Sequence, residues 1–268
     1  LDTKINKELL KRYDHLLSLP HFNYVESFNA NTPYAPVGNL IQLQKLHLAF
    51  VSNQFLNGMT SEAIQSLMHE LHFARMLLAE SNEFVVKMVS INMVARNLRL
   101  LSQLLDTRSA SKVLVNAIGE IPDLNDKEYS MEMPIRKEYV QLVEIYNELT
   151  TIDFVRNVEH TGIIDGMKMK IIPYKINSIK NQLYLLMHTM NNLSQLPSNQ
   201  IEDEIEKVSK WYSAQYNWWD HFYNPIKVEM LSESVPDYSL QFYRIKNLGG
   251  LIRLVRLKSE IYGDNTSS

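Results

Sequence analysis

The sequence predicts an all-α fold, an irregular bundle of about nine to ten helices. Apolar residues recur three and four positions apart along most of the chain, which is the period of an amphipathic helix. Glycine and proline are scarce, with 8 and 9 of 268 residues, whereas a β-sandwich or barrel needs many turns built from them. We therefore expect one helical domain over 1–268, which could divide into two lobes.

Five helices are expected in the first half of the chain. Pro20 ends the first, and Gly58 closes the second, because glycine is favoured just beyond a helix C-terminus. Thr60 or Ser61 is the expected N-cap of the third helix. The expected ranges are about 4–17, 36–55, 60 through at least 78, 82–105 and 109–119.

Residues 119–133 form the best candidate for a linker. The segment holds five acidic side chains against the single Lys127, and Pro122 and Pro134 lie in it or next to it. Such a composition is typical of a solvated loop. If the chain has two lobes, their boundary is expected near 119–134.

Four further helices are expected in the second half. Pro173 suits the first position of one of them, because the N–H that proline lacks has no partner in a first turn. Residues 160–173 alternate weakly and predict a short extended piece or hairpin. The helices are expected over about 134–158, 173 through at least 190, 200–219 and 238–262.

The charge and cysteine content exclude several classes of protein. The chain carries 27 basic and 30 acidic residues, a formal charge of −3, whereas a protein that binds nucleic acid through its phosphates usually has a clear basic excess. There is no cysteine, which removes disulfides, iron–sulfur clusters and thiol nucleophiles. No cofactor is expected either, since the glycines form no phosphate-binding fingerprint.

Histidines 69 and 72 are the nearest approach to a metal motif. The sequence His-Glu-Leu-His spaces His69 and His72 three positions apart, whereas the zinc-protease motif spaces its histidines four apart. No third ligand is indicated. We therefore expect ordinary, partly exposed histidines and no metal site.

Glu70 and Glu80 stand among apolar residues and are candidates for acid–base chemistry. The competing interpretation is a salt bridge with Arg75 or Arg96. Thirty acidic residues offer many pairs, so the sequence selects no catalytic pair.

An aromatic cluster occupies residues 211–225 and contains all three tryptophans. On a helix these side chains would cover two neighbouring faces. They predict a core, a protein interface or a carbohydrate platform, since aromatic rings with polar tips suit interfaces. The residues expected to bind a partner are Trp211, Tyr212, Trp218, Trp219 and Tyr223.

The last expected helix is rich in basic residues. Arg253 and Arg256 are neighbours three positions apart, and they would complement the helix dipole or contact an acidic partner or anionic headgroups. We count both among the candidate partner-binding residues. Leucines and β-branched residues, Leu257 among them, predict that this helix is well buried with basic edges.

Several scattered segments carry a resemblance to a protein family. They include Phe222-Tyr223-Asn224-Pro225-Ile226, Pro236-Asp237-Tyr238, 251–257 and Leu77-Leu78-Ala79-Glu80-Ser81. Together they resemble a group of uncharacterised proteobacterial proteins in which a short N-terminal membrane helix precedes an all-helical, periplasm-facing domain. The resemblance departs at Lys227, where the group tends to have glycine. It implies a periplasmic location and an inner-membrane anchor upstream of Leu1, and it supplies no catalytic residues.

Two functions are the leading interpretations of these observations, and a cytosolic helical regulator is a third class, since the compartment is inferred. The first is a non-enzymatic, periplasm-facing accessory, scaffold or chaperone component that binds other proteins in a bacterial envelope or secretion assembly. The alternative is a hydrolase of cell-wall glycan or peptide, with an Asp/Glu pair in a cleft lined by Trp218 and Tyr223. A concave pocket with a buried carboxylate beside the aromatics would favour the enzyme, and an exposed apolar patch would favour partner binding.

Overall fold

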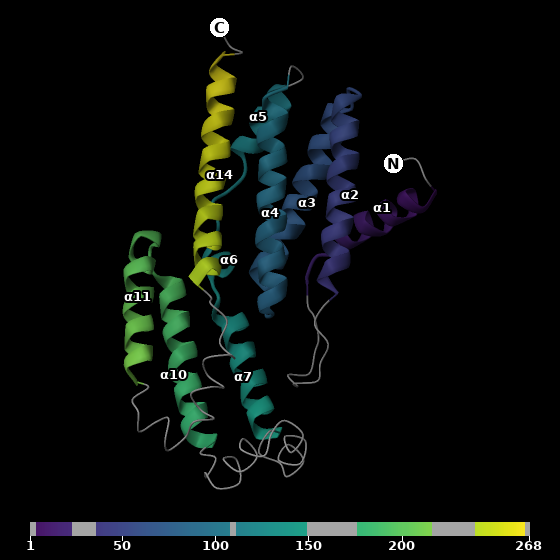
Figure 1. The fold of residues 1–268 in the computed structure, drawn as a ribbon. Helices are drawn as coiled ribbons and strands as arrows, with labels where there is room; N and C mark the ends of the chain where they lie inside the picture. The colour runs from purple at the N-terminus through teal and green to yellow at the C-terminus, as the bar shows by residue number, and fades with distance from the viewer. Residues whose placement is uncertain (1–3, 23–35, 108–110, 149–175, 216–238, 266–268) are drawn as a thin grey trace, which may run out of the picture. The chain divides into compact units, whose positions relative to one another are not determined.

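The computed structural model describes residues 4–22, 36–107, 111–148, 176–215 and 239–265, and every regular element in these ranges is an α-helix (Figure 1). Nine helices have eight residues or more, and α6 has four, which confirms the predicted all-α fold. None of the described helices combines the length and hydrophobicity that crossing a bilayer requires. In chain order they are α1 (Lys4–Leu17), α2 (Val37–Leu56), α3 (Thr60–Glu80), α4 (Phe84–Leu105), α5 (Lys112–Gly119), α6 (Asp126–Tyr129), α7 (Glu132–Glu148), α10 (Ile176–Gln195), α11 (Ser198–Gln215) and α14 (Ser239–Asn265).

The chain forms two compact units. The first contains Leu1–Val25, Tyr34–Ser130 and Tyr243–Ser268, and the second contains Glu26–Pro33 and Met131–Phe242. One boundary, between Ser130 and Met131, falls within the acidic segment where the sequence predicts a division.

Helix α3 is the centre of the first unit, where it contacts α1, α2, α4, α5 and α6. Its apolar residues are buried along the whole length of the helix, from Ala63 to Leu78. Burying one leucine side chain stabilises a fold by about 1.5–3 kcal/mol, so this helix contributes much of the core. Because α3 is covered on several sides, its inward polar groups must find partners inside the protein.

Helix ends in the first unit follow local signals, with two corrections. Gly58 closes α2 as predicted and adopts a positive φ of 84°, a conformation that glycine adopts readily. The predicted N-cap of α3, Thr60 or Ser61, is wrong. Met59 is the N-cap, because its carbonyl accepts the first hydrogen bond of the helix, from Ala63 N–H at 3.1 Å. The Met59 side chain makes no capping bond. Helix α5 begins at Lys112, with Ser111 as its N-cap, rather than at Ser109.

The acidic segment contains an element that the sequence did not reveal. Asn125 and Glu128 form a capping box around α6, in which each side chain accepts from the other residue's backbone N–H. Helix α7 begins at Glu132, two residues before Pro134, since a proline is tolerated in a first turn.

The described part of the second unit consists of α7, α10 and α11. Helix α10 packs against both α7 and α11. Its buried apolar residues include Ile179, Leu183, Leu186 and Met187, which recur at helical spacing. The predicted extended piece over 160–173 lies outside the described residues.

Candidate functional site

Helix α14 has two apolar faces, of which only one is covered. The buried face carries Ile245, Leu248, Ile252 and Val255. On another side, Leu254, Leu257 and Ile261 are 64%, 53% and 55% exposed. We call these three residues the outer seam. Spacings of three and then four place them in one stripe along the helix.

The outer seam corrects the prediction that α14 is buried with basic edges. Leu257, an expected core residue, is more than half exposed. The reason is geometric: its neighbours Val255 and Ser259 face the inside of the unit, so Leu257 lies on the other side of the same turn. Isolated exposed leucines are common, but three in one stripe form a feature that calls for an explanation.

Charged residues flank the outer seam. Arg253 and Glu260 are both exposed, one just before Leu254 and the other just before Ile261. Arg253 Nε donates to Gly249 O of its own helix at 3.3 Å, so the guanidinium stays at the surface. The stripe therefore presents apolar side chains with one positive and one negative group beside them.

Polar contacts on one flank of α14, next to the outer seam, fix the helix on the first unit. Lys258 Nζ donates to Ser102 O at 2.8 Å and to Asp106 Oδ2 at 2.7 Å, and Tyr262 Oη donates to Asp106 Oδ1 at 2.9 Å. Asp106 accepts hydrogen bonds from Lys258 and from Tyr262. These bonds, of which the one from Lys258 has the larger effect, hold the pKa of the Asp106 carboxyl below its usual value. Together they anchor α14 on the end of α4 and set which side chains face outward.

Arg256 lies on the opposite flank of α14 from Lys258. Its guanidinium pairs with the Asp123 carboxylate and also donates to Ile121 O at 3.3 Å. The predicted partner-binding pair is therefore divided by the fold: Arg253 is exposed beside the outer seam, while Arg256 links α14 to the segment before α6.

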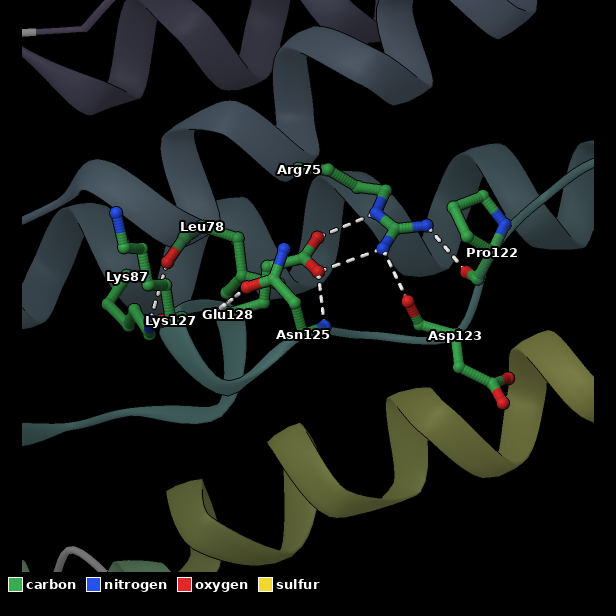
Figure 2. A network of polar contacts seen from close by, with 8 residues as sticks. All are labelled: Arg75, Leu78, Lys87, Pro122, Asp123, Asn125, Lys127 and Glu128. Atoms are coloured by element: carbon green, nitrogen blue, oxygen red, sulfur yellow. Dashed lines mark hydrogen bonds and ion pairs between the residues drawn. The ribbon is translucent and has the colours of Figure 1, made fainter.

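A second polar network surrounds Glu128, which is almost fully buried (Figure 2). The Arg75 guanidinium binds the Glu128 carboxylate in a bidentate pair, with N–O distances of 2.6 and 2.8 Å. Arg75 also donates to the carbonyls of Pro122 and Asp123 at 2.7 and 2.9 Å. Figure 2 shows this guanidinium reaching from α3 to the segment before α6, so one side chain fixes the path of the acidic segment.

Lys87 lies close to this network and is 1% exposed. Its Nζ donates to Leu78 O at 2.5 Å and to Lys127 O at 3.2 Å, which joins the last turn of α3 to α6 (Figure 2). A cation is favourable at the C-terminal end of a helix. Burial lowers the pKa of Lys87 to about 8, although the Glu128 carboxylate opposes the shift.

A third network is sealed between α1, α2 and α3. Tyr13 Oη donates to Glu70 Oε1 at 3.1 Å, and His47 Nδ1 lies 2.8 Å from Glu70 Oε2. All three side chains are at most 2% exposed. Burial, followed by the charge of Glu70, raises the pKa of the Tyr13 hydroxyl far above its usual value. Glu70 thus accepts from two other helices and is closed off from solvent.

The two glutamates of interest form neither of the expected salt bridges. Glu70 pairs with His47, and Glu80 accepts from Phe22 N–H at 2.7 Å with His21 3.4 Å away. The backbone hydrogen bond from Phe22 is the main cause that lowers the pKa of Glu80. Arg75 forms its ion pair with Glu128 instead.

A cavity of about 460 Å³ lies in the first unit beside the Arg75–Glu128 pair. Its walls include Met68, Leu71, Met76 and Ile121. Its lining also includes His72, Glu80 and the Arg75–Glu128 pair, whose polar atoms bond to each other and to backbone groups. The cavity therefore combines apolar walls with a histidine and charged groups.

The remaining predicted site residues are the two histidines of α3 and the aromatic cluster at 211–225. His69 and His72 are exposed, and no metal-binding group of three or more His, Asp or Glu occurs among the described residues. Trp211 and Tyr212 lie in α11, but their side chains are outside the described part, and Trp218, Trp219 and Tyr223 lie outside it altogether. The aromatic cluster therefore stays a prediction, as does the hydrolase cleft built on it.

Comparison with known proteins found no match: no family description, no curated protein and no solved structure is similar to this chain.

The outer seam is the feature that sequence reasoning missed. The signal was present, since α14 carries apolar residues on more sides than a surface helix needs. Only the burial of Ile252 and Val255 shows which side faces the core.

Proposed function

We propose that this chain is a non-enzymatic, protein-binding component of a bacterial envelope or secretion assembly, such as a scaffold, accessory or chaperone subunit. The observation that carries the proposal is the outer seam of α14, an exposed apolar stripe on a helix that is otherwise anchored by polar contacts. Apolar stripes of this kind on stable elements are typical of protein interfaces.

The anchoring of α14 supports binding over accidental exposure. Lys258, on one flank of the seam, ties the helix to α4, and Arg256 ties it to the segment before α6. A helix held in this way presents a preformed surface, which lowers the entropy cost of association. Arg253, beside the seam, adds a charged rim of the kind that interfaces use for specificity.

In-cell crosslinking tests the proposal. The tagged protein is crosslinked in its native bacterium, and wild type is compared with Leu257→Asp and Arg253→Ala. Leu56→Asp is the matched control, because Leu56 is an exposed leucine of the same unit, 74% exposed, at the end of α2. We expect specific crosslinked species in the wild type and the control, fewer with Arg253→Ala, and none with Leu257→Asp. An unchanged pattern for Leu257→Asp would contradict the proposal.

The periplasmic location and the inner-membrane anchor form a second part of the proposal and rest on the family resemblance. Protease added to spheroplasts distinguishes the compartments. We expect the native protein to be digested while the inner membrane is intact, and protection until the cells are lysed would rule out a periplasm-facing domain.

A further inference from the structure

The spacing of the outer seam matches one strand of a short coiled coil. Leu254, Leu257 and Ile261 alternate by three and four, which is the a and d pattern of a heptad repeat. The same pattern extends one step toward the N-terminus to Gly250. A Cβ atom placed on Gly250 would meet nothing within 4 Å, so the space above this residue is open.

We propose that a second copy of this chain covers the outer seam, with the two α14 helices antiparallel. The inference rests on the proposed function, since it names the partner of the same surface. In an antiparallel pair each a position faces a d position of the other copy. Leu254 then faces Leu257 of the second copy, and Gly250 faces Ile261.

The sizes of these residues fit that arrangement. The two central layers place leucine against leucine, and the two outer layers place the large Ile261 against the open space at Gly250. A large side chain opposite a small one keeps two helices evenly spaced along their contact. The arrangement is symmetric about the middle of the seam. Each of the four residues therefore faces a residue of the second copy.

The charges favour the antiparallel direction. Arg253 and Glu260 occupy equivalent heptad positions on the same edge of the seam, and an antiparallel pair brings these edges together. Arg253 of each copy then lies near Glu260 of the other, which gives two complementary pairs. A parallel pair would instead bring Arg253 close to Lys258, which carries the same charge and already binds Asp106, so Arg253 would gain no acidic partner there.

The size of the seam makes the predicted dimer weak. From Gly250 to Ile261 the helix extends about 17 Å at a rise of about 1.5 Å per residue. A contact of this length buries less surface area than the roughly 800 Å² per partner that a stable complex buries. Dimerisation is therefore expected to depend on concentration.

Sedimentation equilibrium of the purified chain tests the inference. We expect the mass to rise from 31.2 kDa toward twice that value with concentration. Leu257→Asp stays monomeric, while Leu56→Asp, the control with an exposed leucine on α2, dimerises like the wild type. A chain that is monomeric at all concentrations, or a dimer that Leu257→Asp leaves intact, would overturn the proposal.

Charge exchange tests the direction of pairing. Arg253→Glu and Glu260→Arg each place like charges together in both pairs, and each should weaken dimerisation about tenfold. The double variant restores both pairs and should return the affinity to near that of the wild type. Single variants without rescue in the double variant would overturn the antiparallel arrangement.

The two proposals fail separately. If the purified chain is monomeric but Leu257→Asp still abolishes crosslinking in cells, the second copy is excluded and the protein-binding function stands. If the purified chain dimerises through the seam, the crosslinked species in cells should include the dimer. Crosslinking in cells to another protein alone, without the dimer, would overturn the inference.

Discussion

At the scale of single residues, Lys87 is the most unusual group of the first unit. A buried lysine that bonds to two backbone carbonyls acts as a tie between α3 and α6. Its pKa of about 8 follows from burial, which disfavours the charged form. The pKa is below the value of about 10.4 that an unfolded chain gives.

This shift predicts how stability depends on pH. Between about pH 8 and 10, the unfolded chain binds a proton at Lys87 that the folded chain has lost, so the free energy of unfolding rises with pH. The full gain is on the order of 2–3 kcal/mol. Urea unfolding at pH 7.5, 9 and 10 should show the rise in the wild type and in Lys45→Met, an exposed lysine control, but not in Lys87→Met. The same pH profile in Lys87→Met and wild type would refute this account.

Glu70 is the second residue whose environment makes a strong prediction. Replacing it by alanine leaves the Tyr13 hydroxyl and the His47 ring buried without their acceptor, which should cost about 3 kcal/mol or more. Tyr13→Phe removes one donor and should cost about 1–2 kcal/mol. Glu120→Ala, at an exposed position, should change stability by less than about 0.5 kcal/mol. Unfolding curves in urea measure all three, and similar losses for Glu70→Ala and Glu120→Ala would count against the network.

Neither network could be predicted from the sequence. Tyr13, His47 and Glu70 come from three helices, and nothing in their local pattern links them. Glu70 and Glu80 stand among apolar residues in the sequence, and the nearest guanidinium groups along the helical pattern made a salt bridge with Arg75 or Arg96 the competing interpretation. The helix packing brings Glu128 to Arg75 instead, and that depends on the path of a segment that composition alone describes as a loop.

At the scale of elements, two adjacent glycines in α14 have different roles. A Cβ atom on Gly249 would lie 2.2 Å from Tyr129 Oη, so α14 approaches α6 closely there. Lys246 Nζ lies over the same tyrosine ring, 5.0 Å from its centre. Gly249 therefore serves packing, which explains a helix-breaking residue in the middle of a helix.

Paired substitutions separate the two roles. Gly250→Ala should stabilise the dilute protein by up to about 1 kcal/mol, because alanine favours a helix and the space is open. Gly249→Ala should destabilise it by about 1–3 kcal/mol, since the added methyl group displaces Tyr129. Thermal or urea unfolding of both variants measures the difference. Equal effects of the two substitutions would mean that α14 does not approach α6 at Gly249.

The helices themselves were largely predictable. Strong apolar periodicity and clear stop signals such as Gly58 gave α1 to α4 to within a few residues. Helix α6 was missed because one turn is too short for periodicity, and its capping box appears only as Asn125 and Glu128 three positions apart. Periodicity also cannot say which of two apolar faces is covered, and this is why Leu257 was placed in the core.

At the scale of the whole molecule, the proposed function depends on the outer face of α14. The first unit has a well-covered centre at α3 and internal partners for its buried charges. Against this background, the outer seam stands out as an apolar surface on an anchored helix. Both proposals predict that this surface is covered by protein in the cell.

Cysteine labelling measures this occupancy most directly, because the chain has no cysteine of its own. Leu257→Cys and the control Leu56→Cys are labelled with a membrane-permeant maleimide, both in the native cell and in dilute purified protein. We predict that the position of Leu257 is labelled several-fold more slowly than that of Leu56 in the cell, and at a similar rate in dilution. An equal ratio of the two rates under both conditions would contradict the claim that the outer seam binds protein.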